Sequence, residues 1–331
     1  MQQIQVGVSL VGSGSARLPV FLSNEELGQV VDTSDEWIQT RTGIQQRGLL
    51  QAHGSLSDLA ATAGQSALEM AAVGATEVDL IILATSTPDD LFGSAAQVQA
   101  QLGATRAVAF DLTAACSGFV FALVTAAQYM RNGVYKTVLV IGADALSRWT
   151  DWTDRRTCVL FGDGAGAVVL KASDRDRLLG FEMHSDGALN GCLNLRYQAD
   201  SDPLVEGKTV QKGTYQPITM NGKEVYRFAV KRVPEVIEKA LFRADLTPAD
   251  IQWLVLHQAN QRILDAVADR LKVPSERVVS NMARYGNTSA ASIPLALDEA
   301  VRDHRIQPGD IVASAGFGAG LTWGAAIFEW G

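Results

Sequence analysis

Apolar runs and helical patterns follow one another in the same order in both halves of the chain. In the first half, Val78–Thr85 has the continuous apolar character of a fully buried strand. A second strand is predicted to end just before Cys116, and the spacing of apolar residues predicts a helix from Phe119. Thr137–Gly142 reads as a third strand, and the glycine-rich stretch Val159–Leu170 is expected to form a turned β-hairpin.

The second half repeats this order at similar offsets. Ile251–His257 is the buried strand, and a junction at Tyr285–Ser292 leads into a helix. Asp310–Gly316 then reads as a further strand, and Leu321–Phe328 as the closing arm of a hairpin.

Two βαβ-rich units are therefore predicted, residues 1–172 and residues 173–331, although sequence identity between them is negligible. If the units pack about a pseudo-twofold axis, Cys116 and Asn287 become counterparts, each at a helix N-terminus beside one central crevice. His257, at the end of a buried strand, would face that crevice too. Ligands of α/β sheets bind beyond strand C-termini and at helix N-termini.

Composition narrows the class of protein further. The chain has 331 residues, 47% of them hydrophobic and 19% charged, which is typical of a well-buried soluble α/β protein. A net charge of −8 argues against nucleic acid as a partner, and no apolar run is long enough for a membrane span. Residues 1–6 lack the features of a secretory signal. Three cysteines without a CxxC pair predict a reducing, cytoplasmic compartment, and no metal-ligand spacing occurs.

The position of Cys116 is the strongest chemical signal in the sequence. An apolar strand gives way to small residues, and a helix follows at once, so the thiol is expected near a helix N-terminus. There the partial positive charge of unpaired N–H groups favours the thiolate, and a low thiol pKa is predicted. The alternative is a buried, inert cysteine, because free cysteine is among the most buried residue types.

His257 and Asn287 are weak signals one at a time. A histidine after a buried strand is commonly a structural residue, and an asparagine before serine and threonine is commonly a turn or helix-cap residue. Together with Cys116 they describe a thiol nucleophile beside two neutral hydrogen-bonding groups. Such a thiol can take an acyl group from a thioester while backbone N–H groups near Cys116 and in Gly316–Gly320 hold the oxyanion. The neutral pair can then polarise the carbonyl of a second substrate that loses CO₂.

These residues lie in motifs that resemble the β-ketoacyl-[acyl-carrier-protein] synthase III family, the initiating condensing enzymes of type II fatty-acid synthesis. The resemblance runs nearly end to end, and the motifs in this order are a specific signal. They are Asp32–Ile44, Ala114–Phe119, Phe161–Gly166, His257–Asn260, Gly286–Ser292 and Leu321–Gly324. The resemblance implies the thiolase fold, in which two pseudo-duplicated halves form an αβαβα layered α/β structure.

The same resemblance implies an acyltransferase mechanism. Cys116 would be acylated by a short acyl-CoA, usually acetyl-CoA, with the oxyanion held by the backbone N–H groups of Cys116 and Ala319. His257 and Asn287 would drive decarboxylation of malonyl-ACP (malonyl acyl carrier protein), and the carbanion would attack the acyl-enzyme to give acetoacetyl-ACP. The coenzyme A thioester is a substrate, so no cofactor is implied. A homodimer is expected.

Binding residues also follow from the resemblance. Phe92 aligns with a residue that in the family crosses the dimer interface to close the partner's acyl pocket, where a large aromatic ring would favour a short acyl group. The resemblance places Leu146 in the same pocket. Arg262, with Arg227 and Lys231, would form the docking site for the acidic carrier protein. The implied coenzyme A contacts are Thr33, Trp37, Arg41, Arg155, Met220, Gly222, Tyr226, Ala229 and Asn260.

Three positions depart from the family pattern. Ala319 stands where the middle of three glycines is common, which matters only if that position requires a positive φ. Gly93 replaces a frequent proline, and its effect on the local turn is open. Lys223 replaces a frequent asparagine, where its ammonium group could meet a phosphate.

Other enzymes with the same fold differ in their catalytic residues. A thiolase needs a second catalytic cysteine late in the chain, and neither Cys158 nor Cys192 lies in such a motif. An elongating synthase uses a histidine where Asn287 stands. The alternatives left open are a Cys-His-Asn condensing enzyme of secondary metabolism and a non-catalytic acyl-CoA or carrier-protein binding module. The acyl-CoA chain length is also open.

Overall fold

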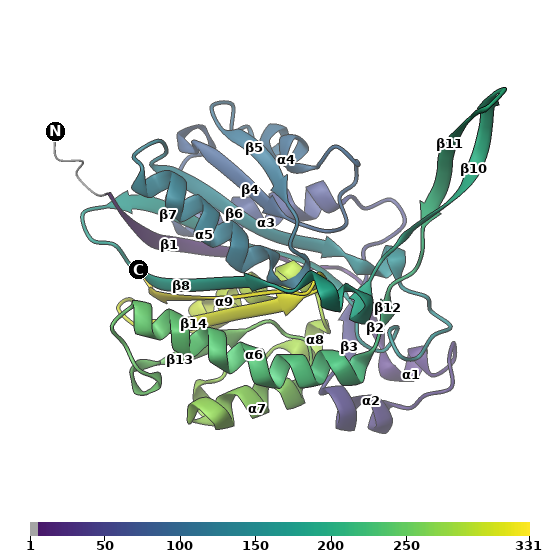
Figure 1. Cartoon of the computed structure of the whole chain (residues 1–331). Coiled ribbons are helices and arrows are strands. Elements are labelled where there is room, and N and C mark those ends of the chain that lie inside the picture. Colours follow the sequence, from purple (N-terminus) through teal and green to yellow (C-terminus); the bar gives the residue numbers. More distant parts are fainter. Residues whose placement is uncertain (1–5) are drawn as a thin grey trace.

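The computed structural model describes residues 6–331 and contains two main β-sheets (Figure 1). The first sheet has the strand order β1-β7-β6-β4-β5. Strands β6, β4 and β5 are parallel, whereas β7 runs antiparallel to both β6 and β1. The bounds are β1 Gly7–Ala16, β4 Leu80–Ala84, β5 Val108–Leu112, β6 Thr137–Ala145 and β7 Asp163–Ser173.

The second sheet has the order β13-β14-β15-β8, with β13 parallel to β14 and the other neighbours antiparallel. Its bounds are β8 Leu178–Ser185, β13 Trp253–Leu256, β14 Ile311–Gly318 and β15 Thr322–Glu329. The chain thus passes from the first sheet to the second between Ser173 and Leu178. The division into units 1–172 and 173–331 stays a prediction, because elements of the two halves pack on each other. These are α2 (Asp35–Thr42) on α7 (Gln261–Leu271) and β3 (Gln46–Gly48) on α8 (Met282–Tyr285).

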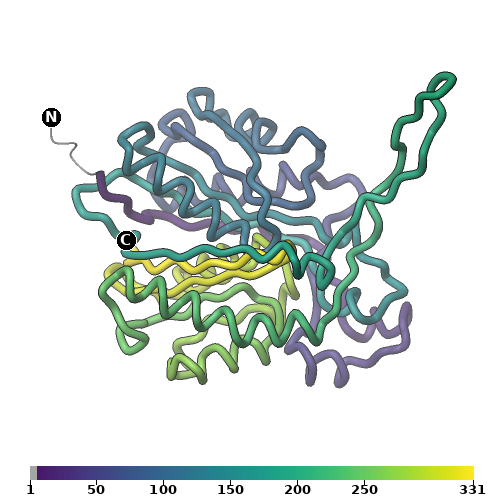
Figure 2. Tube along the Cα trace, in the orientation of Figure 1, coloured from purple at the N-terminus to yellow at the C-terminus, as the bar shows by residue number. Residues whose placement is uncertain are grey.

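Helices complete a five-layer αβαβα sandwich, as the predicted thiolase fold requires (Figure 2). Helices α5 and α9 lie between the sheets, and a shared apolar core surrounds them. Most of α5 is buried, because it contacts a sheet on either side. Helices α3 and α4 cover the outer face of the first sheet, and α6 covers that of the second with α7 packed on it. The bounds are α3 Leu56–Met70, α4 Ala95–Leu102, α5 Gly118–Arg131, α6 Gly222–Arg243, α7 Gln261–Leu271 and α9 Ser292–Arg302.

The predicted hairpin at Val159–Leu170 is wrong, because residues 163–170 all belong to the single strand β7 and residues 159–162 form no strand paired with it. Its glycines serve close packing rather than a turn. A Cβ on Gly166 would lie 2.6 Å from the backbone nitrogen of Leu295 in α9, so only glycine fits here.

The pseudo-twofold relation is visible in the backbone at the starts of α5 and α9. Each helix is preceded by a 3₁₀ turn, at Ala115–Ser117 and Ser289–Ala291, whose first residue has a positive φ of 47° and 51° respectively. This equivalence makes Ala290, rather than Asn287, the counterpart of Cys116. The glycines of the neighbouring strands agree: Gly316 of β14 faces the Cys116 carbonyl, and Gly142 of β6 faces the Ala290 carbonyl. The predicted pairing of Cys116 with Asn287 is therefore wrong by three residues.

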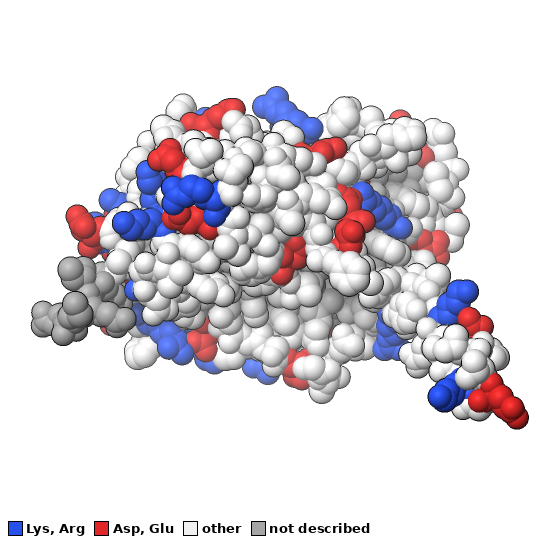
Figure 3. All heavy atoms as spheres, turned by 90° about the horizontal axis from the view of Figure 1, so that it is seen from above, with Lys and Arg blue, Asp and Glu red and all other residues white. Residues whose placement is uncertain are grey.

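A β-hairpin arm, β10 with β11, projects from the body of the molecule and is almost wholly exposed (Figure 1). In the view from above, charged side chains of both signs mark the arm (Figure 3). Among residues 6–331, no helix combines the length and apolar character that crossing a bilayer needs. The smaller elements are β2 Phe21–Ser23, α1 Asn24–Leu27, α2 Asp35–Thr42, β3 Gln46–Gly48, β9 Leu193–Asn194, β10 Tyr197–Val205, β11 Lys208–Tyr215, β12 Thr219–Met220 and α8 Met282–Tyr285.

Candidate active site

Cys116 lies on the wall of a cavity of about 1350 Å³ between the two halves. The 3₁₀ turn that carries it sits directly before α5 and packs on β14. A Cβ on Gly318 would lie 2.6 Å from the Cys116 backbone nitrogen, and one on Gly316 would lie 3.0 Å from its carbonyl oxygen. Both glycines are therefore needed for β14 to approach the nucleophile turn, while Ala319, just beyond the strand, also lines the cavity.

The predicted low pKa of the Cys116 thiol is wrong. Burial raises this pKa to about 12, against a smaller lowering effect of a hydrogen bond with the Ser289 side chain. Because the site is desolvated, the cost of a buried anion outweighs the favourable field of the helix start. At neutral pH the buried thiol therefore favours its protonated form.

His257 follows β13 directly and is also buried. Its ring packs edge-on against Phe317, with ring centroids 5.3 Å apart, and its Nδ1 atom is 2.7 Å from the Ser292 hydroxyl oxygen. Burial lowers the pKa of His257 to about 3, so the imidazole is neutral at physiological pH. A neutral ring can donate or accept a hydrogen bond at Nε2, depending on its tautomer.

Asn287 is fixed at both its backbone and its side chain. Its backbone pairs with the segment before β7: Gly162 N–H donates to its carbonyl at 3.0 Å, and its own N–H donates to Leu160 O at 2.8 Å. Its side-chain Oδ1 accepts from Ser289 N–H at 2.9 Å. The amide NH₂ group makes no hydrogen bond within residues 6–331, and so it is available as a donor.

The short segment 287–292 joins the three predicted catalytic residues. The Ser289 side chain lowers the pKa of the Cys116 thiol, and its backbone N–H donates to the Asn287 side-chain oxygen. The Ser292 hydroxyl contacts Nδ1 of His257. Sequence reasoning did not identify Ser289 and Ser292 as functional, although both lie in the motif Gly286–Ser292. The sequence feature that could have identified them is the concentration of small polar residues at a helix start beside a candidate site.

Asp144 is a second residue that the sequence reasoning missed. It is completely buried at the end of β6, and burial raises its pKa. Its carboxyl group accepts from Ser86 N–H at 2.8 Å and from Ala290 N–H at 3.1 Å. It therefore ties the first half to the start of α9. A carboxyl residue that ends an otherwise apolar strand was the available signal.

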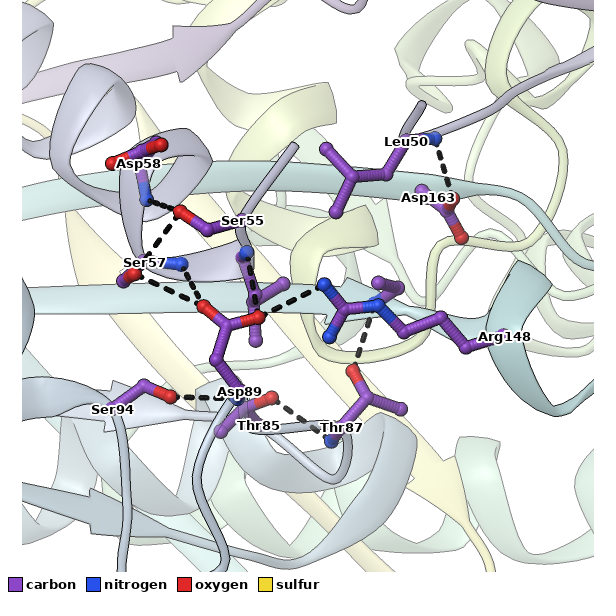
Figure 4. A network of polar contacts seen from close by, with 12 residues as sticks. Leu50, Ser55, Ser57, Asp58, Thr85, Thr87, Asp89, Ser94, Arg148 and Asp163 are labelled. Atoms are coloured by element: carbon purple, nitrogen blue, oxygen red, sulfur yellow. Dashed lines mark hydrogen bonds and ion pairs between the residues drawn. The ribbon is translucent and has the colours of Figure 1, made fainter. Parts of the chain in front are cut away.

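Both residues predicted for the acyl pocket, Phe92 and Leu146, line the cavity. Phe92 is 99% exposed, at the tip of a loop that polar contacts hold in place. In that loop, Asp89 accepts from the backbone N–H groups of Leu56 (3.0 Å) and Ser57 (2.8 Å) and pairs with Arg148 at 2.9 Å (Figure 4). The exposed ring is thus presented by a fixed loop.

Two of the three departures from the family pattern have a structural explanation. Ala319 does not have a positive φ, which falls instead at Gly320 (128°), so the alanine is unstrained. Its carbonyl accepts from the Thr322 hydroxyl at 3.2 Å, which also contacts Ala114 O at 3.1 Å, so this loop is tied to the segment before Cys116. Gly93 has a φ of 107°, which proline cannot adopt. Nothing in the structure explains Lys223.

The residues predicted to bind coenzyme A form a separate cluster at the end of the molecule where α2, α6 and α7 meet. The guanidinium groups of Arg41 and Arg155 lie 4.8 and 5.1 Å from the Trp37 ring centroid. Asn260 caps α7 and donates to Arg41 O at 3.0 Å. The Thr33 hydroxyl is buried without a partner among residues 6–331. None of the nine predicted residues lines the cavity at Cys116.

Four of the predicted coenzyme A contacts lie on α6 or at the end of β12 just before it, and they differ in solvent accessibility. Met220, at the end of β12, and Tyr226 are partly exposed, and Gly222 is exposed at the start of the helix. Ala229 is completely buried in the apolar core, and its predicted place on a coenzyme A-binding wall stays a prediction. Its small side chain lets α6 pack closely on the sheet.

The three predicted carrier-protein contacts are exposed on α6 and α7. Arg262 lies 5.5 Å above the ring of Tyr226, and Arg227 pairs with Glu224 at 2.9 Å. Lys231 lies one helical turn further along α6 than Arg227.

Comparison with known proteins agrees with the geometry. The model described as "3-Oxoacyl-[acyl-carrier-protein (ACP)] synthase III C terminal" matches residues 241–330, and "3-Oxoacyl-[acyl-carrier-protein (ACP)] synthase III" matches residues 110–187. The chain is 69% identical to a protein of Synechococcus elongatus over 98% of each chain, and 67% identical to one of Acaryochloris marina over 100% of this chain and 99% of that one; both are called "Beta-ketoacyl-[acyl-carrier-protein] synthase III".

Solved structures with related titles share the whole fold. The synthase III of Thermus thermophilus superposes with a TM-score of 0.90 at 44% identity, covering 98% of this chain and 99% of that one. The synthase III of Aquifex aeolicus gives 0.88 at 42% identity, covering 98% and 100%. The predicted family is confirmed: the chain belongs to the β-ketoacyl-[acyl-carrier-protein] synthase III family of acyltransferases.

Proposed function

We propose that this chain transfers an acetyl group from acetyl-CoA to Cys116 and condenses it with malonyl-ACP, giving acetoacetyl-ACP and CO₂. The observation that carries the proposal is one thiol, Cys116, on a cavity wall that Ser289 also lines. The segment 287–292, to which Ser289 belongs, contains the neutral group Asn287 and contacts the neutral His257 through Ser292. No cofactor is required, since the coenzyme A thioester is itself a substrate.

The first step is a thioester exchange at Cys116. The Cys116 sulfur bonds to the acetyl carbonyl carbon, the carbon–sulfur bond to coenzyme A breaks, and the thiol proton passes to the leaving sulfur. The backbone N–H groups of Cys116 and Ala319 stabilise the oxyanion. Because the thiol pKa is about 12, proton loss has to accompany bond formation rather than precede it.

The second step is decarboxylation followed by carbon–carbon bond formation. The malonyl carboxylate leaves as CO₂, and its electron pair is delocalised onto the thioester oxygen of an enolate. Neutral N–H groups of His257 and Asn287 stabilise that oxygen. The enolate carbon then attacks the acetyl-enzyme, acetoacetyl-ACP forms, and the released Cys116 thiolate takes a proton from solvent.

The cluster around Trp37 is the proposed site for the nucleotide of coenzyme A. An indole face beside two guanidinium groups suits an adenine ring and its phosphates, and base stacking on such a face contributes about 1–3 kcal/mol. The unpartnered Thr33 hydroxyl offers a further hydrogen bond there. The pantetheine arm would run along Met220, Gly222 and Tyr226, with Asn260 at its side.

The exposed arginines of α6 and α7 are the proposed docking site for the acyl carrier protein. Arg262, Arg227 and Lys231 would meet its acidic surface, an interaction that we expect to weaken as salt concentration rises. The three cysteines are free thiols, which fits the reducing conditions of the cytoplasm, where we place the protein.

A homodimer is proposed as the functional state. The edge strand β5 has no neighbour on one side among residues 6–331, and the large apolar side chains of Leu91 and Phe92 are strongly exposed beside it. An unpaired edge and exposed apolar side chains are typical of an interaction surface. In a dimer, Phe92 would close the partner's cavity and limit the acyl group to a short one.

The test uses the two half-reactions separately. Incubation with labelled acetyl-CoA should give an acetyl adduct on Cys116 by mass spectrometry, and addition of malonyl-ACP should convert the label to acetoacetyl-ACP. The Cys116→Ala variant should release CO₂ from malonyl-ACP without forming product, whereas His257→Ala and Asn287→Ala should lose at least about a hundredfold in decarboxylation. An unmodified Cys116 in a protein that binds coenzyme A would identify a binding module instead.

A further inference from the structure

The hydrogen bond between His257 and Ser292 has a direction that the surrounding donors fix. Both side chains are almost completely buried, and the Nδ1–Oγ distance is 2.7 Å. The Ser292 oxygen also accepts a hydrogen bond from the backbone N–H of Gln258 at 3.3 Å. A backbone N–H can only donate, so one acceptor site of this hydroxyl is already used.

The hydroxyl proton of Ser292 has one acceptor within reach. In the part of the chain that the structure describes, residues 6–331, Nδ1 of His257 is the sole acceptor at hydrogen-bonding distance from it. A serine hydroxyl carries a single proton, and a buried donor left without an acceptor costs about 1–3 kcal/mol. The proton therefore points at Nδ1, which has to be the unprotonated nitrogen of the neutral ring.

We propose that Ser292 is a positioning residue that keeps the ring proton of His257 on Nε2, so that the imidazole meets the substrate as a hydrogen-bond donor. Ser292 is the first residue of α9, and it contacts the imidazole at Nδ1 rather than at Nε2. It acts on the reaction only through His257.

Segment 287–292 also fixes the orientation of the Asn287 side-chain amide. Its side-chain oxygen is occupied by Ser289 N–H, which leaves the NH₂ group as the free end. Segment 287–292 thus orients two neutral donors, Nε2–H of His257 and the amide of Asn287. The catalytic value of this arrangement rests on the proposed function, because two donors stabilise an enolate oxygen whereas a lone pair on Nε2 would repel it.

The first experiment reads the tautomer directly. The chain has four histidines, so ¹⁵N-histidine labelling of the full-length protein gives a spectrum that single substitutions can assign. In the wild-type protein the His257 signals should show a protonated Nε2 and an unprotonated Nδ1. A proton on Nδ1 of His257 in the wild-type protein would overturn the proposal, whether or not the protein decarboxylates malonyl-ACP.

The second experiment connects the tautomer with the rate. In a Cys116→Ala background, Ser292→Ala should lower kcat for malonyl-ACP decarboxylation roughly tenfold, which corresponds to one lost hydrogen bond of about 1.4 kcal/mol, with KM little changed. The NMR spectrum of Ser292→Ala should show His257 with part of its proton on Nδ1. Ser292→Thr, which keeps the hydroxyl, should restore both the rate and the Nε2–H signal.

Ser314→Ala is the matched control, because Ser314 is a completely buried serine of β14 whose hydroxyl has no partner among residues 6–331. It should leave the His257 tautomer and the rate unchanged. A Ser292→Ala protein with wild-type tautomer and rate would overturn the proposal. An Nε2-protonated His257 in a protein that does not decarboxylate malonyl-ACP would support the tautomer assignment and contradict the proposed function.

Discussion

The chemistry of Cys116 depends on how its buried thiol loses a proton. With a pKa of about 12, the thiolate fraction should rise about tenfold per pH unit throughout the accessible range. We expect the rate of iodoacetamide modification of Cys116, followed by peptide mass spectrometry, to keep rising to at least about pH 10. Ser289→Ala should slow it further at each pH, since the Ser289 hydrogen bond lowers the pKa. A plateau below pH 8 would show that the thiol ionises near neutrality.

His257 links the stability of the protein to pH. Its pKa is about 3 when folded and 6.5 as the ordinary value, so below pH 6.5 the unfolded chain binds a proton that the folded one does not. The free energy of unfolding is therefore unaffected by this group above about pH 6.5, falls by about 1.4 kcal/mol per pH unit between pH 6.5 and 3, and levels off below pH 3. Urea unfolding of wild type and His257→Asn at pH 7.5, 6 and 5 should show the smaller pH dependence in the variant. Equal slopes would mean that His257 is protonated in the folded state.

At the scale of residues, the sequence was sufficient to single out Cys116, His257 and Asn287 as candidates but not to give their electrostatics. Residue type and position after a strand or before a helix indicated these three groups, and the structure connects His257 and Asn287 through segment 287–292, whose Ser289 lines the cavity with Cys116. The direction of the Cys116 pKa shift was missed, because desolvation depends on everything packed around the sulfur. The roles of Ser289 and Ser292 were missed for the same reason, since their partners are distant in sequence.

Among the elements, β6 and the 3₁₀ turn before α9 pack so closely that one added methyl group should force them apart. A Cβ on Gly142 would lie 2.2 Å from the carbonyl oxygen of Ala290, which belongs to segment 287–292. We expect Gly142→Ala to lower the free energy of unfolding by about 1–3 kcal/mol and to reduce condensation activity, as measured by urea unfolding and product formation.

Gly187→Ala is the control for this substitution, because a Cβ there meets nothing within 4 Å. It should change the unfolding free energy by less than about 0.5 kcal/mol. If Gly142→Ala behaved in the same way, close packing at the start of α9 would not be limiting.

The periodicity of apolar residues in the sequence predicted strands and helices well where burial was uniform. It predicted them poorly where glycines serve close packing. The strands β4, β6 and β14 and the helix α5 were predicted because continuous apolar runs and 3.6-residue spacing are direct consequences of their layers. The glycines of β7 look like turn residues in the sequence, and only the position of α9 shows their purpose. Likewise, only the equivalent 3₁₀ turns before α5 and α9 identify Ala290 as the counterpart of Cys116.

For the whole molecule, the exposed side chain of Phe92 gives a test of assembly. A charge in the middle of an apolar interface should be costly, so Phe92→Asp should weaken the dimer at least tenfold by sedimentation equilibrium. Phe242→Asp is the matched control, because Phe242 is 82% exposed on the distant helix α6. A monomeric wild-type protein at micromolar concentration, or equal effects of both substitutions, would contradict the proposed interface.

The layered architecture as a whole was predictable from the resemblance, whereas the β10–β11 arm was not. The five layers follow from repeated βαβ units that bury both faces of each sheet. The arm lacks a buried face, so its sequence carries no strong alternation to distinguish it from a loop.

The two left-handed residues that precede α5 and α9 set a trade-off between robustness and rate. Ala115 and Ser289 both hold a backbone conformation that glycine adopts more easily, at a cost of about 1–3 kcal/mol each. Selection for heat resistance alone would favour glycine at both places. A glycine at position 289 would, however, lack the hydroxyl group that lowers the pKa of the Cys116 thiol, so the hardier protein would hold a thiol that ionises less readily.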